Sequence, residues 1–228
     1  MANAGQKPKG KVGIKWSPDF SYGLGLLASD GNLSPDGRHI SFVSKDFEQM
    51  HNFLKVFQIK DIKIGGTTSG YYKKIKVFRV QFGDVQFYKF LTSIGITVNK
   101  SKSIGIVNIP PPFQFDFLRG VFDGDGTFYS YWDKRWKSSH MFYIEFASAS
   151  TMHIKWIRSL LKERLGIVGH ITNSKEGGTY QLKYAKREAL EIIKKMYYNA
   201  RAVCLSRKKA KIFKALEVER LQQKQYGW

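Results

Sequence analysis

The stretch that decides the fold lies near the middle of the chain and reads Phe117-Leu118-Arg119-Gly120-Val121-Phe122-Asp123-Gly124-Asp125-Gly126. Its apolar residues recur at helical spacing, which predicts a helix with one apolar face. Gly120 and Gly124 lie four residues apart and form a flat stripe that a second backbone could approach closely. Asp125-Gly126 would end the helix. An acidic residue at that end opposes the helix dipole, so Asp125 is either a tolerated exception or a carboxylate kept for a cation.

A second copy of this segment stands 95 positions earlier, at Tyr22-Gly23-Leu24-Gly25-Leu26-Leu27-Ala28-Ser29-Asp30-Gly31. The two copies align without a gap. The matched pairs are Gly25 with Gly120, Ser29 with Gly124, Asp30 with Asp125 and Gly31 with Gly126. Two such helices could pack through their small residues and bring Asp30 and Asp125 side by side.

This pair of segments resembles the two motifs of the single-chain LAGLIDADG homing endonucleases. The second copy is a close match. The first departs from the pattern at Gly23, where a leucine is usual, and at Ala28, where an acid is common. The resemblance covers about residues 17–215. It implies an α/β (α+β) fold in which two pseudo-symmetric αββαββα repeats form a DNA-binding saddle and meet at a central two-helix interface.

The rest of the chain fits two repeats of one element order. We expect a first repeat at 1–103 with a loose arm at 1–15, a proline-rich linker at 104–112 and a second repeat at 113–228. Ser17 and Asp46 are expected to begin helices, and Ser150 or Thr151 a third. The expected first-repeat elements are a helix to about 28, a strand at 38–44, a helix at 47–57, strands near 61–64 and 71–82, and a helix at 84–94. The expected second-repeat elements are helices at 113–124, 151–165, 187–198 and 205–221, with strands at 127–135, 140–147, 168–173 and 179–184.

Net charge is the strongest global signal. The chain has 38 Lys and Arg against 18 Asp and Glu, a formal charge of +20, which indicates a polyanionic partner and most simply nucleic acid. A single cysteine excludes internal disulfides and a cysteine-rich zinc site, and the five histidines lack metal-ligand spacing. No apolar run is long enough for a membrane span, and the first residues lack an apolar signal core. We therefore expect an intracellular, non-secreted protein, with prokaryotic cytoplasm and organelle matrix both open.

Two carboxylates at close range do not both ionise easily without a counter-charge. Mg²⁺ supplies one, because it binds to one or two carboxylates together with phosphate oxygens and waters. We expect Asp30 and Asp125 to be metal ligands and catalytic residues, with backbone carbonyls near Ser29 and Gly124 as further ligands; Mn²⁺ or Ca²⁺ could take the same sites. A calcium loop at 123–134 is rejected, because its sixth and twelfth positions are Phe128 and Lys134.

Each repeat ends in a basic cluster where the family places a lysine beside the metal site. The clusters are Asn99-Lys100-Ser101-Lys102 and Ser206-Arg207-Lys208-Lys209. Alignment selects Lys100 and Lys208, which the resemblance implies would stabilise transition-state charge or orient the attacking water. For each lysine, a simple solvated basic surface is the alternative interpretation.

The predicted strands alternate apolar and polar residues, so one face should pack on helices and the other should face solvent. An ordinary half-exposed sheet is the alternative to a DNA-reading one. The outward set is basic, amide-bearing and aromatic, which suits phosphates and base edges. The candidate DNA contacts of the first repeat are Arg38, Ser41, Lys63, Arg79 and Gln81. Those of the second are Tyr129, Tyr131, Arg135, Tyr143, Glu145, His170, Thr172, Gln181 and Lys183.

The resemblance implies a site-specific double-strand DNA endonuclease, a hydrolase that uses Mg²⁺ and leaves short 3′ overhangs at a long target site. Both motifs lie on one chain, so a monomer is expected. The alternative is a non-cleaving relative, either an RNA maturase that assists intron splicing or a DNA-binding regulator. Possession of both terminal Asp residues favours the enzyme, but some maturases also have both.

Overall fold

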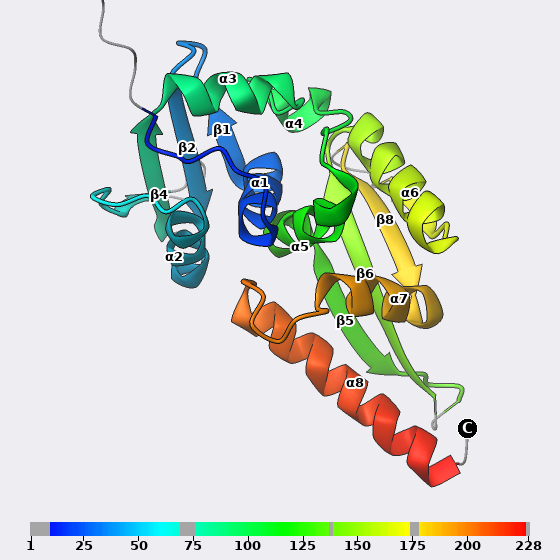
Figure 1. Ribbon diagram of the computed structural model, residues 1–228. Coiled ribbons are helices and arrows are strands. Elements are labelled where there is room, and N and C mark those ends of the chain that lie inside the picture. The colour runs from blue at the N-terminus through cyan, green and yellow to red at the C-terminus, as the bar shows by residue number, and fades with distance from the viewer. Residues whose placement is uncertain (1–9, 69–75, 137–138, 174–177, 227–228) are drawn as a thin grey trace, which may run out of the picture.

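Two repeats of one element order form the protein in the computed structural model, which describes residues 10–68, 76–136, 139–173 and 178–226 (Figure 1). The first repeat contains α1 (Pro18–Asp30), β1 (Gly31–Leu33), β2 (His39–Ser44), α2 (Phe47–Val56), β3 (Gly65–Thr68), β4 (Lys76–Gly83) and α3 (Val85–Ser93). A short helix α4 (Lys100–Ser103) and a 3-10 turn (Pro111–Phe113) follow. The second repeat contains α5 (Gln114–Asp125), β5 (Thr127–Trp132), β6 (His140–Ser148), α6 (Thr151–Leu165), β7 (His170–Asn173), β8 (Tyr180–Ala185), α7 (Lys186–Met196) and α8 (Ser206–Tyr226).

Each repeat builds a four-stranded antiparallel sheet with the same strand order, β1-β2-β4-β3 in the first and β5-β6-β8-β7 in the second. The alternation in the strands decides which face is buried. Phe42 and Val80 of the first sheet and Phe142 and Leu182 of the second are fully buried under the helices, while their sequence neighbours point the other way. The predicted fold class of two pseudo-symmetric repeats is confirmed.

Side-chain caps begin three of the helices where the sequence predicts a start. The Ser17 hydroxyl accepts a hydrogen bond from the Phe20 amide, and Ser150 accepts one from the His153 amide. Asp84 caps α3 in the same way. Such caps satisfy amides that have no partner inside the helix. Asp46 was expected to do the same for α2, but its side chain makes no cap hydrogen bond.

One predicted strand is wrong. We expected a strand near 61–64, whereas β3 spans Gly65–Thr68 and pairs with β4. The strand begins at two glycines, which are depleted in strands, and lies at the edge of its sheet. Its position therefore comes from pairing with β4, because its own sequence has no apolar alternation. Asp61, expected to begin a strand, instead has a left-handed backbone with φ of 60°.

The arm and the linker are more closely packed than their composition suggested. The amides of Lys11 and Val12 donate to the Asp84 carboxylate at 2.5 and 3.0 Å, so residues 10–12 are held against α3; residues 1–9 lie outside the described part. In the linker, the Ile104 carbonyl accepts from the Ser150 hydroxyl, and Gly105 from the His153 ring. The linker is thus seated on α6.

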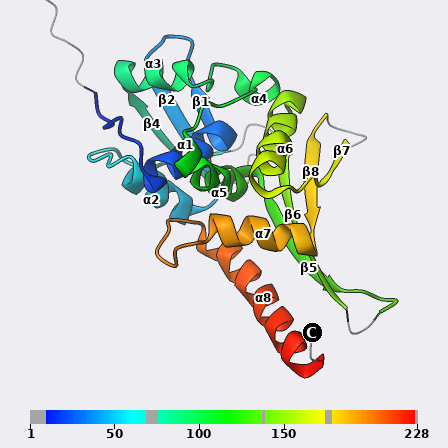
Figure 2. The ribbon, with the colours of Figure 1, turned by 45° about the vertical axis from the view of Figure 1, so that its right-hand side comes forward.

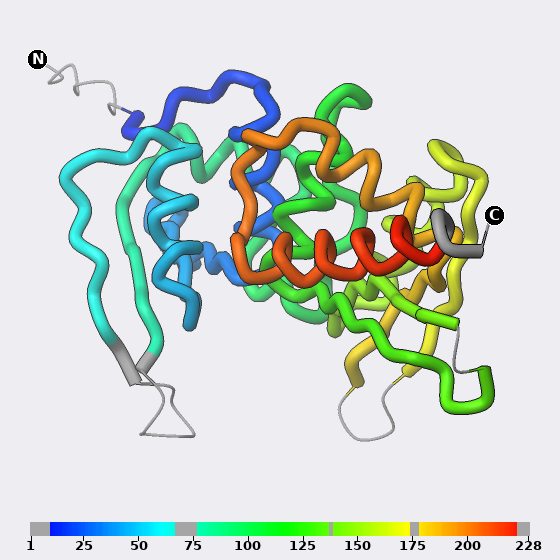
Figure 3. Tube along the Cα trace, turned by 90° about the horizontal axis from the view of Figure 1, so that it is seen from below, coloured from blue at the N-terminus to red at the C-terminus, as the bar shows by residue number. Residues whose placement is uncertain are grey.

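The arrangement leaves one side of the molecule to the hairpins. Seen from below, the β3–β4, β5–β6 and β7–β8 pairs all extend toward the same side (Figure 3). The two motif helices lie side by side between the sheets, in the front view and after a 45° turn alike (Figure 2). Within the described residues, none of the helices combines the length and the apolar character that crossing a membrane requires.

Candidate active site

The two motif helices touch through their glycines. A Cβ added to Gly120 would lie 2.1 Å from the Tyr22 carbonyl oxygen, and one added to Gly25 would lie 2.2 Å from the Phe117 carbonyl oxygen. Both distances are far shorter than any contact between a carbon and an oxygen, so α1 and α5 have no room for a methyl group at these positions. The contact brings the C-terminal ends of both helices together.

Asp30 and Asp125 are the last residues of those helices. A Cβ on Gly124 would lie 3.1 Å from the Asp30 carboxylate, so this carboxylate reaches the end of the partner helix. The glycines that follow, Gly31 and Gly126, have extended backbones with φ of −79° and −82°, rather than the left-handed conformation that often ends a helix. They are needed for space, because a Cβ on Gly126 would lie 2.4 Å from the Phe122 ring.

Their surroundings raise the pKa of both carboxylates. Burial and then the negative charge of Asp125 raise the pKa of Asp30 to about 7, against the opposing charges of Lys100 and Lys208. Burial also raises the pKa of Asp125, again opposed by both lysines. Asp125 still has an exposed edge, so this carboxylate has both a restricted water shell and an open side. Such a pair is suited to a cation that replaces the missing positive charge.

The two lysines selected by alignment both lie at the helix ends. Lys100 is only 6% exposed, and its Nζ donates to the Ser29 carbonyl at 2.8 Å. Lys208 is 7% exposed and donates to the carbonyls of Phe122, Asp123 and Gly126 at 2.6, 2.9 and 2.6 Å. Burial lowers the pKa of each to about 8. Two solvated basic surface residues would not be placed in this way.

Two cavities flank the helix ends, and each combines residues of both repeats. One, of about 290 Å³, is lined by Asp125 of the second repeat together with Ser29 and Lys100 of the first. The other, of about 320 Å³, is lined by Asp30 of the first repeat together with Gly124 and Arg207 of the second. The first cavity thus combines Asp125 with Lys100 of the opposite repeat, and the second combines Asp30 with Arg207 of the opposite repeat; Lys45 and Asp46 also line the second.

Arg207 is a site residue that the sequence analysis missed. Its guanidinium donates two hydrogen bonds to the Asp46 carboxylate, at 2.9 and 2.7 Å. This pairing explains why Asp46 does not cap α2. Arg207 stands directly before Lys208 in the basic cluster. Its partner Asp46 lies 161 residues away in the sequence, so the sequence alone does not show that Arg207 lines the cavity of Asp30.

A buried polar network behind the site was also missed. The Asp123 carboxylate accepts hydrogen bonds from the Tyr22 hydroxyl at 2.8 Å and from the Leu205 amide at 2.7 Å. It thereby ties α1, α5 and the segment leading into α8 at one point. Arg119, fully buried, donates to the carbonyls of Met196, the last residue of α7, and of Val203 in the segment leading into α8. These bonds position the start of α8 and hence Lys208.

The outward face of each sheet carries most of the candidate DNA contacts. In the first sheet, the Arg79 guanidinium donates to the Gln81 amide oxygen at 2.5 Å, and both side chains are exposed. In the second, the Tyr143 ring stacks on Tyr129 and Tyr131 at 5.2 and 6.1 Å. The cross-strand register aligns the remaining members on one face, in the rows Glu145–Lys183–His170 and Gln181–Thr172.

Several candidate contacts lie elsewhere than expected. Arg38 precedes β2, Lys63 precedes β3 and Arg135 follows β5, so none of the three is a strand residue. Ser41 and Glu145 are on the expected strands but are buried, at 6% and 8% exposure. Lys63 lies outside a strand because the edge strand β3 begins later than expected. Arg135 lies outside a strand because β5 ends at Trp132, earlier than the alternation indicated. The Glu145 carboxylate is paired with Lys183 at 3.5 Å.

The donor set fits a hard divalent cation. Within the described residues no group of three or more His, Cys, Asp or Glu side chains gathers at one place, so the protein offers two carboxylates and adjacent carbonyls. Oxygen-only donors with few protein ligands are typical of Mg²⁺, which retains waters and phosphate oxygens in its shell. The carbonyls of Ser29 and Gly124 already accept from Lys100 and Lys208, at 2.8 and 3.4 Å, so the two carboxylates are the main candidate ligands.

The raised pKa of Asp30 predicts a pH-dependent stability. In the folded chain Asp30 holds its proton up to about pH 7, against a usual value of 3.8, so the folded state binds more protons between those values and stability falls as the pH rises through them. Without divalent ions, we expect Asp30→Asn to flatten the decline of the melting temperature between about pH 4 and 7. Asp19→Asn, at the exposed opposite end of α1, is the control. An equal slope in both variants would contradict the perturbed carboxylate.

Known proteins resemble this chain in sequence over one repeat and in structure over both. Residues 112–213 match the model of the LAGLIDADG-like domain family. No curated protein matches the sequence. The I-SmaMI LAGLIDADG homing endonuclease bound to cleaved DNA has a TM-score of 0.56 at 14% identity, over 95% of this chain and 93% of that one. The homing endonuclease I-WcaI bound to its DNA recognition sequence has a TM-score of 0.57 at 14% identity, over 87% and 88%.

A protein that is not described as an endonuclease is equally similar. Full-length DUF199/WhiA from Thermatoga maritima has a TM-score of 0.58 at 15% identity, over 93% of this chain. The present chain spans 63% of the length of that protein. At these identities the likenesses establish a shared fold, and the chemistry depends on the residues of the site itself.

Proposed function

We propose that this chain, a LAGLIDADG protein by the family match of its second repeat and by the fold of both, is a site-specific double-strand DNA endonuclease. The observation that carries the proposal is the pair Asp30 and Asp125 at two touching helix ends, each in its own cavity with a cation from the opposite repeat. Two equivalent catalytic sites, one in each cavity, would allow a monomer to cut both strands. The shared fold with DNA-bound homing endonucleases supports duplex DNA as the substrate.

The two aspartates and the two lysines have different roles in the proposed reaction. Asp30 and Asp125 would hold divalent cations, most simply Mg²⁺. A bound Mg²⁺ would supply an activated water and stabilise the leaving oxygen of the phosphodiester. Lys100 and Lys208, held by backbone carbonyls, present positive charge where charge develops on the phosphate. The family resemblance implies cuts a few base pairs apart that leave short 3′ overhangs.

The direct test incubates the full chain with a randomised duplex library and Mg²⁺, followed by sequencing of the cut ends. We expect cut ends that share a long recurring sequence with a fixed short 3′ stagger. A library in which one sequence is bound but never cut would overturn the enzyme and support the non-cleaving alternative, a DNA-binding regulator. The fold is shared with DUF199/WhiA, which is not described as an endonuclease, so the same assay has to test the non-cleaving alternative as well. Binding of an intron RNA with no cleaved DNA would support a maturase.

Salt dependence tests the extended contact with DNA. A chain of net charge +20 that neutralises many phosphates releases many counterions on binding. We expect the logarithm of the duplex association constant to fall against the logarithm of salt concentration with a slope steeper than about −3. Anisotropy titrations of a labelled duplex between low and moderate salt measure it. A shallower slope would show that only a few phosphates are contacted.

Arg79 tests whether the outward sheet face reads bases. Its guanidinium is held by Gln81 and presents its remaining donors outward, which suits the two acceptors of guanine in the major groove. We expect Arg79→Ala to cost about 1–3 kcal/mol of binding at one or two base positions only. Binding to a panel of single-base target variants measures this pattern. An equal loss on every sequence would instead identify a phosphate contact.

A further inference from the structure

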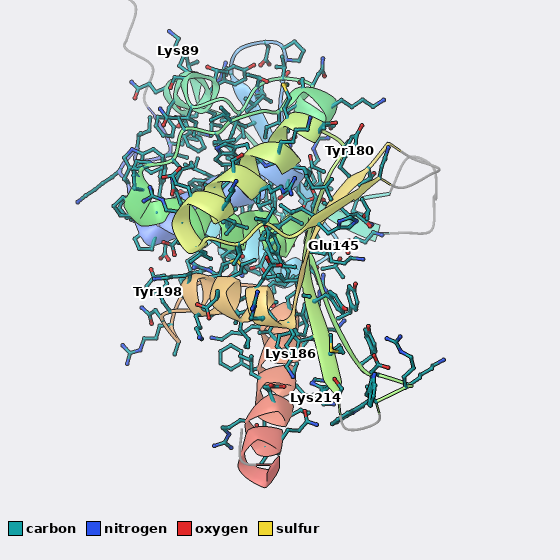
Figure 4. The ribbon with its side chains drawn as sticks, turned by 90° about the vertical axis from the view of Figure 1, so that its right-hand side faces the viewer. Lys89, Glu145, Tyr180, Lys186, Tyr198 and Lys214 are labelled. Atoms are coloured by element: carbon teal, nitrogen blue, oxygen red, sulfur yellow. The ribbon has the colours of Figure 1, made fainter. Side chains whose placement is uncertain are left out.

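A groove outside the proposed active site runs between β5 and α8. In Figure 4 helix α8, which carries Lys214, extends from the body beside the β5–β6 hairpin, and α8 contacts both β5 and β6. The groove has a volume of about 440 Å³. The proposed active-site residues do not line it. Its lining includes Ser130, Trp132, His140, Lys211 and Lys214.

The groove is basic on one wall and aromatic on the other. Lys211 and Lys214 are exposed and lie three residues apart on α8, hence on one face of the helix. Among the residues that the structure describes, no acidic side chain lines the groove, so the two positive charges have no acidic partner in its lining. On the opposite wall Trp132 is 50% exposed, with its ring tilted against the His140 ring at 5.0 Å.

His140 adds a polar atom without a partner. The side chain is almost fully buried in the groove wall, and its Nδ1 has no hydrogen-bond partner in the described part of the chain. Its backbone carbonyl accepts from Lys186 at 3.1 Å, and Lys186 is paired with Glu219 of α8 at 2.5 Å. The wall is thus a built structure, since β6 and α8 are joined through these two charges.

The groove borders the face proposed to read duplex DNA, because Tyr129 and Tyr131 also line it, but most of its lining lies on the other side of β5. Side chains alternate along β5, and Tyr129 and Tyr131 stack with Tyr143 on the outward face. Ser130 and Trp132 therefore point to the opposite face, toward α8. A ligand in this groove would lie behind the β5–β6 hairpin rather than in the saddle.

We propose that this groove binds an unpaired nucleotide of single-stranded nucleic acid. The base would stack on Trp132 while Lys211 and Lys214 bind its phosphates, the combination of aromatic platform and basic channel that binds single strands. The volume of about 440 Å³ suits about one nucleotide. Single-stranded DNA and RNA share this chemistry, and the site is independent of whether the chain cleaves DNA.

The test measures binding of fluorescein-labelled 15-mers of dT and of rU to the full chain by anisotropy. Lys211→Gln/Lys214→Gln removes the basic wall, and Trp132→Ala removes the platform, with Trp132→Phe as the conservative variant. Lys155→Gln/Lys162→Gln, two exposed lysines on α6, is the charge-matched control. Binding of a labelled random duplex is measured on every variant, and thermal melts verify that each is folded.

We expect Trp132→Ala to weaken 15-mer binding by about 5- to 100-fold, and Trp132→Phe by clearly less. The groove lysine pair should lose more single-strand affinity than the α6 pair, while duplex binding changes equally in both. Stronger binding of rU than of dT would assign the site to RNA, and the reverse to DNA. Equal losses in the two lysine pairs, or unchanged binding by Trp132→Ala, would overturn the site. Neither result depends on nuclease activity, so the two proposals fail separately.

Discussion

Asp30→Asn and Asp125→Asn are each expected to abolish double-strand cleavage and to leave DNA binding intact. Each substitution removes the only carboxylate in its cavity that comes from a motif helix end. Loss of a metal ligand at a phosphoryl-transfer site removes several kcal/mol of transition-state stabilisation, so cleavage should fall by about a thousandfold or more. Binding should survive, because the proposed phosphate and base contacts lie on the sheets and the substitution makes the chain slightly more positive.

The measurement pairs single-turnover cleavage in Mg²⁺ with equilibrium binding in a metal-free buffer. Asp19→Asn is the matched control, since it makes the same change at the exposed beginning of the same helix α1. Each cavity has its own carboxylate, so any residual activity of a single variant is expected to be nicking of one strand. A variant of either residue that still cuts both strands near the normal rate would refute the assignment of the two carboxylates.

The second large effect is expected from Gly120→Ala. The added methyl would lie 2.1 Å from the Tyr22 carbonyl oxygen and 2.9 Å from the Gly25 Cα, so both obstacles are backbone and neither can rotate away. We expect a loss of about 3 kcal/mol in the free energy of unfolding, at the upper end for overpacking. The helices must also separate, and a displacement of about 1 Å between Asp30 and Asp125 can cost roughly a hundredfold in rate.

Thermal melts and single-turnover cleavage on the same preparation, at a temperature where the variant is folded, measure both effects. Gly13→Ala is the control, because a Cβ there meets nothing within 4 Å. We expect cleavage to fall further than the loss of folded protein explains. A Gly120→Ala protein with normal stability and normal cleavage would show that the two helices do not meet at this glycine, and the shared site would be refuted with it.

The sequence by itself was sufficient for most of the elements and for the pairing of the two motif helices. Helix and strand periods are local properties, so α1, α5 and the strands of both hairpins follow from patterns within ten residues. The duplicated glycine stripe and terminal Asp-Gly predicted a contact between segments 95 residues apart. The net charge indicated a polyanionic partner. The periodicity is a property of neighbouring residues, the motif is a repeat, and the charge is a property of composition, so all three can be recognised without the tertiary structure.

Only the tertiary structure decided which partners meet. Lys100 lies at the site because its Nζ reaches Ser29, 71 residues away, whereas Lys102 in the same cluster is exposed. Asp46 reads as a helix cap and instead binds Arg207. The edge strand β3 has no pattern of its own, since its position is set by pairing with β4. Each of these depends on long-range hydrogen bonds, and a polar side chain in a sequence does not specify which distant partner folding will bring to it.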